Sequence, residues 1–154
     1  RLIDAHATWP TRPGYTPILD LTDLPPADAD RMARGAALFA HCAGCHQADG
    51  RGVRGFYPPL AGSPIVTGPV EPLLSILLHG LDGPLVLEGI TYNQPMPAAP
   101  MQSDEDLAAI GTYIRLAWKN SASPLTESDV ARTRAEISSH VGAWTVQELH
   151  KRWK

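Results

Sequence analysis

Cysteine, aromatic residues and charge are all scarce in this chain. Of its 154 residues, two are Cys, 6% are aromatic and 19% are charged, while 44% are hydrophobic. So little charge fits neither a disordered protein nor a coiled coil. No apolar run approaches the roughly 18 residues that a membrane span needs, and the best one covers only residues 73–78. The composition therefore predicts one soluble domain, large enough to hold a core of its own.

Proline and glycine are abundant instead. Fifteen Pro and thirteen Gly predict short helices separated by much loop. The net charge of −3 gives no nucleic-acid footprint, although residues 31–60 carry four Arg against one Asp. The chain begins at Arg1 without an initiator Met, so we take it for a processed chain or an excised domain.

The two cysteines lie in one short motif, Cys42-Ala43-Gly44-Cys45-His46. This is the C-x-x-C-H pattern of covalent haem attachment. Positions i, i+3 and i+4 share a face of a helical turn, so both thiols can reach the vinyl edges of one porphyrin. His46 then lies at the iron as the proximal ligand. The motif predicts one haem c, covalently bound through Cys42 and Cys45.

Three other uses of these cysteines were weighed. A disulfide between them would cross-link almost nothing, and a thioredoxin-like redox centre would require a βαβ pattern that is absent. A zinc site would need a second pair of ligands besides His41 and His46. Buried structural cysteines would not require His46. Haem attachment is the interpretation that uses all three residues.

Several segments in order resemble class I c-type cytochromes. They are residues 35–46 with Asp49-Gly50-Arg51-Gly52, residues 57–63, residues 90–97 and residues 103–115, which together span about residues 30–120. The resemblance implies an all-α fold wrapped around one covalent haem. Residues 77–84, 89–92 and 118–120 look most like bacterial dehydrogenase-associated cytochromes, which are subunits or fused domains of quinoprotein or flavoprotein dehydrogenases.

Met96 is the predicted second axial ligand. It lies between Pro95 and Pro97, and each proline restricts the backbone, so the loop can aim a soft thioether at iron. In the family the Met-Pro pair follows a Tyr at short range, as Tyr92 does here. Met101 is the main competitor, and a His ligand or an open site stays an alternative.

Other contacts to the haem are expected as well. By the resemblance, the second ring nitrogen of His46 should bond the backbone carbonyl of Pro58, or of Pro59 if the register differs. Arg51 and Arg54 can pair with haem propionates, because a guanidinium suits carboxylates, although both can equally be solvated loop charges. Tyr92 can reach a propionate or pack on the ring.

We expect three parts: an N-terminal arm or linker over residues 1–27, a cytochrome c domain over 28–122 and a helical C-terminal extension over 123–154. In the domain, Asp28 or Asp30 should cap a first helix that runs into the haem motif. A short helix should cover residues 71–79, and the proline-rich residues 81–101 should form a loop with no strand. By the resemblance, Gly35 and Phe39 should meet Tyr113 and its neighbours in the last core helix.

The later helices show clear starts. Ser103 should cap a helix whose apolar stripe consists of Leu107, Ile110, Ile114 and Trp118. Thr126 should cap a helix through Ile137. Thr145 with Glu148 should form a capping box for a last helix that ends at Trp153.

One-electron transfer is the predicted function, from a dehydrogenase partner or fused dehydrogenase domain to a downstream acceptor. The chain should have no catalysis of its own, and c-type attachment implies a periplasmic or other extracytoplasmic location. The alternative is a haem enzyme or gas-binding sensor with a labile distal Met. A docking module whose arm and tail do the binding is the third hypothesis.

Overall fold

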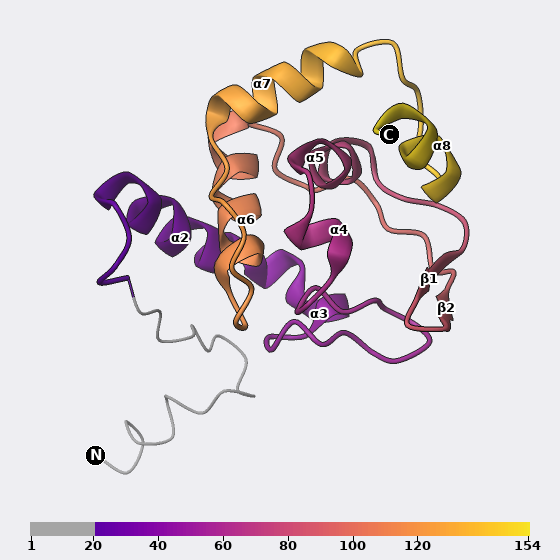
Figure 1. The fold of residues 1–154 in the computed structure, drawn as a ribbon, viewed down its shortest axis with the longest axis horizontal. Helices are drawn as coiled ribbons and strands as arrows, with labels where there is room; N and C mark the ends of the chain where they lie inside the picture. Colours follow the sequence, from indigo (N-terminus) through magenta and orange to yellow (C-terminus); the bar gives the residue numbers. More distant parts are fainter. Residues whose placement is uncertain (1–20) are drawn as a thin grey trace.

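The computed structural model describes residues 21–154, so residues 1–20 of the predicted arm lie outside it. Most of the regular secondary structure in residues 21–154 is helical, as predicted (Figure 1). Within residues 21–154, no helix is both long and apolar enough to span a bilayer.

Helix α2 (Pro26–Leu38) and helix α6 (Asp104–Leu116) cross and form the main helix pair (Figure 1). Gly35 makes the crossing close, because a Cβ there would meet the Ala109 carbonyl oxygen and would lie 2.7 Å from the Tyr113 Cβ. The rings of Phe39 and Tyr113 are 5.2 Å apart at their centroids. The predicted contacts of Gly35 and Phe39 with Tyr113 are therefore confirmed.

The start of α2 differs from the prediction. The helix begins at Pro26, inside the predicted arm, and neither Asp28 nor Asp30 caps it. Pro26 occupies the first helical position, where its fixed φ suits the helix and its missing N–H is not needed. Asp28 lies in the first turn instead and pairs with Arg31 at 2.9 Å.

Two short helices and a hairpin follow the haem motif. Helix α4 covers Pro64–Thr67, and helix α5 covers Val70–His79 and buries its apolar face. The expectation of a loop without strands over residues 81–101 is wrong, since β1 (Leu85–Leu87) and β2 (Ile90–Tyr92) pair in antiparallel register, Leu85 opposite Tyr92. The turn consists of Glu88 and Gly89, both with positive φ, which suits the twist of a two-residue hairpin.

Helix α6 ends earlier than its apolar stripe predicted. Its last residue is Leu116, and Trp118 adopts a φ of 54°. The Trp118 side chain turns back toward α2, where its ring lies 5.1 Å from that of Phe39 and its N–H donates to the Ala48 carbonyl at 3.0 Å. Trp118 therefore connects α6 to the loop after the haem motif and is not part of the helix stripe.

The C-terminal segment contains helix α7 (Glu127–Glu136) and helix α8 (Val146–Arg152). Both begin with capping boxes, formed by Thr126 with Asp129 and by Thr145 with Glu148. α7 packs on α5 and α6, and α8 lies toward the hairpin side of the molecule (Figure 1). The segment shares the core of the rest of the molecule through its buried apolar residues, which are Leu125, Val130, Ile137, Trp144 and Leu149.

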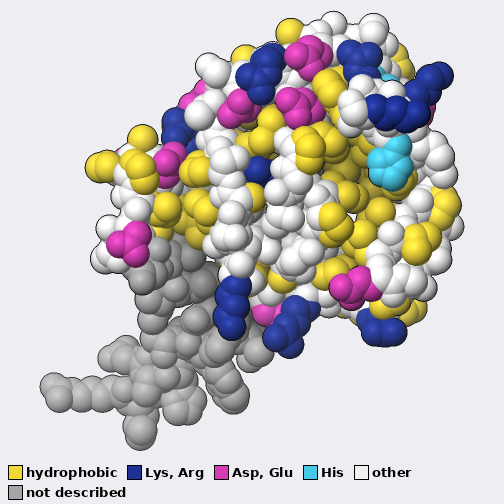
Figure 2. All heavy atoms as spheres, viewed as in Figure 1, with side chains coloured by type: hydrophobic (Ala, Val, Ile, Leu, Met, Phe, Trp, Pro, Cys, Tyr) yellow, Lys and Arg dark blue, Asp and Glu magenta, His cyan; other side chains and the backbone are white. Residues whose placement is uncertain are grey.

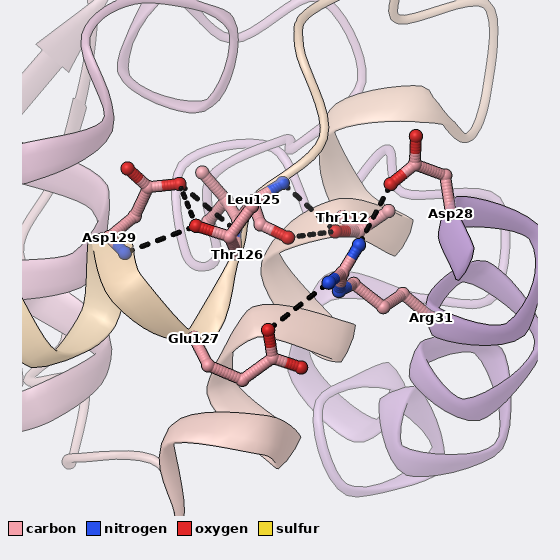
Figure 3. A network of polar contacts seen from close by, with 7 residues as sticks. All are labelled: Asp28, Arg31, Thr112, Leu125, Thr126, Glu127 and Asp129. Carbon is pink, nitrogen blue, oxygen red and sulfur yellow. Dashed lines mark hydrogen bonds and ion pairs between the residues drawn. The ribbon is translucent and has the colours of Figure 1, made fainter. Parts of the chain in front are cut away.

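Polar contacts join this segment to the two main helices (Figure 3). The Thr112 hydroxyl on α6 donates to the Leu125 carbonyl at 3.2 Å and accepts from the Leu125 N–H at 3.0 Å. Arg31 on α2 pairs with Glu127 at 3.1 Å. The two buried hydrogen bonds between the Thr112 hydroxyl and the Leu125 backbone fix the register of the segment against α6.

Candidate cofactor site

The haem motif forms one tight helical turn. A short 3₁₀ turn, η1 (Phe39–His41), leads into Cys42, and helix α3 covers Ala43–His46. The His46 N–H donates to the Cys42 carbonyl at 2.9 Å, so the cysteine and the histidine lie one turn apart. Gln47 then leaves the helix with a φ of 62°. The two cysteines and His46 thus come from a single turn and line a common hollow.

His46 is buried and its ring is oriented by the backbone. Its side chain is 6% exposed, and Nδ1 lies 2.9 Å from the carbonyl oxygen of Pro58. A carbonyl can only accept, so Nδ1 carries the proton and Nε2 keeps its lone pair for a metal. Burial lowers the pKa of His46, against the opposing effect of the Pro58 bond. The imidazole is therefore neutral at pH 7, as a metal ligand must be.

The loop 47–62 holds the Pro58 carbonyl in place. The Gly52 N–H donates to the His46 carbonyl at 2.9 Å, and Val53 and Tyr57 exchange backbone hydrogen bonds. Asn120, after α6, closes the loop from outside: its side chain accepts from the Gly62 N–H at 2.8 Å and donates to the Leu60 carbonyl at 3.1 Å. The position of the Pro58 carbonyl beside His46 thus depends on contacts with Asn120, which follows α6.

An apolar hollow opens beside His46. It consists of two adjoining parts that are lined mainly by hydrophobic side chains. Hydrophobic side chains come to the surface between α5 and the hairpin, where the face is hollowed (Figure 2). Seven residues line both parts: Cys42, His46, Pro58, Leu77, Leu81, Leu85 and Met96. Among residues 21–154, no Asp, Glu, Lys or Arg lines either part.

Met96 lies on the wall of this hollow. Its backbone pairs with Leu81 in both directions, at 2.8 and 2.9 Å. Pro95 and Pro97 flank it and also line the hollow. Met101 and Met32 pack against or within the hydrophobic core, and neither is among the residues that line the hollow.

The other predicted contact residues fall into two groups. Tyr92 is buried at the end of β2 and lines the hollow next to the Met96 loop. Arg51 and Arg54 are exposed on the 47–62 loop and do not line it; the Arg51 side chain is 83% exposed and makes only a long contact of 3.9 Å with Asp49. Neither arginine is therefore brought to the walls of the hollow.

Several wall residues were missed by the sequence analysis. Leu81 and Leu85 come from the stretch expected to be a plain loop, and Val66 comes from α4. The hairpin had a signal, because Leu-Val-Leu and Ile-Thr-Tyr flank Glu88-Gly89, a pair that suits a two-residue turn. No sequence signal indicated that Leu81 pairs with Met96, because the two residues are distant in the sequence.

These residues fit a covalent haem c. Two thiols and a neutral imidazole share one turn, a thioether lies on the wall of the same hollow, and the walls are apolar. An imidazole nitrogen and a thioether sulfur are ligands that iron takes in c-type haem proteins. Within residues 21–154, no group of three or more His, Cys, Asp or Glu side chains that could hold a metal ion is found.

Comparison with known proteins gives the same picture. The cytochrome c family model matches residues 32–118, more than half of the chain. Cytochrome c-552 of Thermus thermophilus is 38% identical over 114 residues, a match that covers 68% of this chain and 87% of that protein. The fructose dehydrogenase cytochrome subunit of Gluconobacter japonicus is 35% identical over 107 residues, covering 66% of this chain and 22% of the subunit.

A second dehydrogenase subunit is similar to the same extent. The cytochrome c subunit of the quinone alcohol dehydrogenase of Gluconacetobacter polyoxogenes is 35% identical over 107 residues, covering 64% of this chain and 22% of the subunit. The matched segment is therefore most of the Thermus protein but about a fifth of each dehydrogenase subunit.

Proposed function

The chain belongs to the cytochrome c family, and from this premise we propose that it carries single electrons from a dehydrogenase to a downstream acceptor through a haem ligated by His46 and Met96. The observation that carries the proposal is that His46 and Met96 line one apolar hollow next to the two cysteines. A covalently bound haem c supplies one iron that alternates between the ferric and ferrous states.

Cys42 and Cys45 would attach the haem through their sulfur atoms, and His46 would ligate iron through Nε2. The hydrogen bond from His46 Nδ1 to the Pro58 carbonyl fixes the ring orientation and raises the basicity of the ligand. Leu77, Leu81 and Leu85 line the hollow and would keep water away from the bound haem. The low dielectric that results is one of the factors that set a haem potential.

Met96 would supply the second protein ligand of the iron, so that no open site would be left for bond chemistry. A flexible thioether suits this position, and Met opposite His raises the reduction potential. Tyr92, on the same wall, would contact the haem edge. Arg51 and Arg54, on the exposed loop, would approach the propionates or a partner.

The partner in this proposal is a dehydrogenase subunit or a fused dehydrogenase domain. Two relatives are named as cytochrome subunits of dehydrogenases, which supports this partner class. Arg51 and Arg54 come shortly before Phe56 in the same loop, and all three are exposed, so this loop suits transient docking to an acidic surface of the partner. Covalent haem attachment places the protein outside the bacterial cytoplasm in this proposal.

The optical spectrum of the reduced, haem-loaded protein tests the ligation. The spectrum of the native chain should not change when carbon monoxide is added, because both axial positions are filled. Met96→Ala should open one position, so carbon monoxide should shift the spectrum and the reduction potential should fall. Met101→Ala is the matched control, since Met101 does not line the hollow, and it should do neither.

A prompt shift in the native chain would refute the closed site and favour a gas-binding protein or haem enzyme. Loss of the sixth ligand in Met101→Ala, with Met96→Ala unchanged, would show that the wrong methionine was chosen.

A further inference from the structure

Residues 80–82 lie between the Met96 loop and the C-terminal segment. On one side, the Leu81 N–H donates to the Met96 carbonyl at 2.9 Å and the Met96 N–H donates to the Leu81 carbonyl at 2.8 Å. On the other side, the Asp82 N–H donates to the Trp144 carbonyl at 2.8 Å, and the Trp144 N–H donates to the Gly80 carbonyl at 3.0 Å. An extended segment of three residues therefore separates Met96 from Trp144.

The backbone of the Met96 loop depends on residues 80–82 for its hydrogen bonds. Pro95 and Pro97 have no backbone N–H, so Met96 supplies the only backbone donor of that tripeptide, and it is used by Leu81. The fit is close as well: a Cβ on Gly80 would meet the Met96 carbonyl oxygen and would lie 3.0 Å from the Ala98 nitrogen. A shift of residues 80–82 would therefore move the Met96 backbone with them.

Trp144 is itself firmly placed. Its side chain is 4% exposed, and its ring stacks on that of His140 with a centroid distance of 3.4 Å and an interplanar angle of 4°. The His140 ring in turn lies 5.3 Å from that of His79, the last residue of α5. The Thr145 capping box begins immediately afterwards and fixes the direction of the chain. The side chain of Trp144 thus anchors the backbone groups that bind residues 80–82.

We propose that Trp144 is a positioning residue for Met96: it holds residues 80–82 so that the Met96 loop stays closed and its sulfur stays at the axial position. The inference rests on the proposed ligation by Met96. Trp144 lies outside the segment matched by the family model, which ends at residue 118. The C-terminal segment therefore belongs to the ligand site and does more than cover the core.

Imidazole binding to the ferric, haem-loaded protein measures how often the Met96 loop opens. Imidazole can take the axial position only when Met96 has left it, so its apparent Kd varies inversely with the open fraction. Trp144→Ala should tighten apparent imidazole binding by about tenfold or more. Trp144→Phe, which keeps a buried aromatic ring, should give a smaller effect in the same direction and serves if the alanine variant does not fold.

Leu125→Ala is the matched control, because Leu125 is fully buried in the same C-terminal segment but pairs with Thr112 on α6. It should destabilise the protein to a similar extent, since both changes empty a buried site. Apparent imidazole binding should nevertheless stay within about twofold of the native value. Hydrogen exchange at the Met96 amide gives an independent measurement: it should become faster in the Trp144 variants and not in Leu125→Ala.

Equal imidazole binding and equal Met96 amide exchange in the two alanine variants would overturn the inference and leave Trp144 as a core residue alone. A native protein that binds imidazole as tightly as Met96→Ala does would overturn the proposed ligation first, whatever Trp144 does. The two failures are therefore distinguishable.

Discussion

At the scale of single residues, Gly52 controls how closely the 47–62 loop folds against His46. Its φ is 62°, in the left-handed region, and its N–H donates to the His46 carbonyl. A Cβ at this position would meet the Tyr57 carbonyl oxygen and would lie 2.6 Å from the Pro58 oxygen. The same oxygen accepts the His46 Nδ1–H, so a side chain at residue 52 would disturb the orientation of the His46 ring.

Gly52→Ala should lower the free energy of unfolding of the haem-loaded protein by about 1–3 kcal/mol and should raise its reduction potential. The potential rises because displacement of the Pro58 carbonyl weakens the bond that makes the imidazole a stronger donor. Denaturant unfolding and a redox titration measure the two effects.

Gly55→Ala separates strain from contact in this experiment. Gly55 also has a positive φ, 78°, but a Cβ there would meet nothing within 4 Å. Gly55→Ala should therefore lower the free energy of unfolding through backbone strain and leave the reduction potential unchanged. Identical potentials in the two variants would argue against a role of the Pro58 carbonyl.

The contrast between His46 and Pro58 shows what sequence can predict for single residues. The C-x-x-C-H spacing alone places His46 with both cysteines on one turn, because the helical period is local. The choice between Pro58 and Pro59 depended on which carbonyl the folded loop presents, and the positive φ values and hydrogen bonds of residues 50–62 decide it. No side chain in that loop encodes the choice.

At the scale of elements, the starts of α7 and α8 were predicted correctly, whereas the start of α2 was not and the hairpin was missed because its sequence signal is weak. Thr126 and Thr145 act within three residues of their partners, so their capping boxes can be recognised in the sequence. The strands are three residues long, too short for an alternating pattern, and lie among prolines. The early end of α6 was missed because Trp118 keeps helical spacing in sequence while packing on Phe39 from outside the helix.

The contact between α5 and the turn after α7 predicts a dependence of stability on pH. Burial lowers the pKa of His79 at the end of α5, and the nearby His140 and Arg134 lower it further. The folded protein therefore favours the neutral ring, so its contribution is complete above the ordinary His pKa of about 6.5 and is lost as the pH falls below it.

His79→Asn should remove this part of the pH dependence. Between about pH 7.5 and about pH 5.5, the native protein should lose more unfolding free energy than the variant does. Denaturant unfolding at both pH values measures the difference. Equal losses in the two proteins would mean that His79 has the same pKa in the folded and unfolded states.

At the scale of the whole molecule, the C-terminal segment is part of the core. Leu125, Val130, Ile137, Trp144 and Leu149 are all buried among residues of the family segment. Residues 123–154 were predicted to form a helical extension, because the capping residues of their helices can be recognised in the sequence. Their burial was not predictable, because it depends on partners such as Gly111 and Gly80 that are distant in the chain.

Deletion of residues 123–154 should leave a chain that is barely folded, even with haem attached. Each of the five buried apolar side chains contributes about 1.5–3 kcal/mol, and the sum rivals the roughly 5–15 kcal/mol that stabilises a whole domain. Thermal unfolding followed by circular dichroism measures the loss. Val141→Ser, at a position that is 91% exposed in the same segment, should leave the transition unchanged.

A truncated chain with a native melting transition would show that residues 1–122 fold without the C-terminal segment. In that case the shared core would contribute far less than its burial indicates.

The hydrogen bonds between Trp144 and residues 80–82 bear on how this cytochrome can be transplanted. Family boundaries would suggest excising residues 32–118 for a fusion protein, a biosensor or an electrode coating. Such a cassette would keep the proposed iron ligands His46 and Met96 but lose Trp144, which is hydrogen-bonded to residues 80–82 beside the Met96 loop. A unit that is meant to keep these hydrogen bonds must therefore extend past Trp144, and a shorter one should change the redox behaviour of the protein as well as its stability.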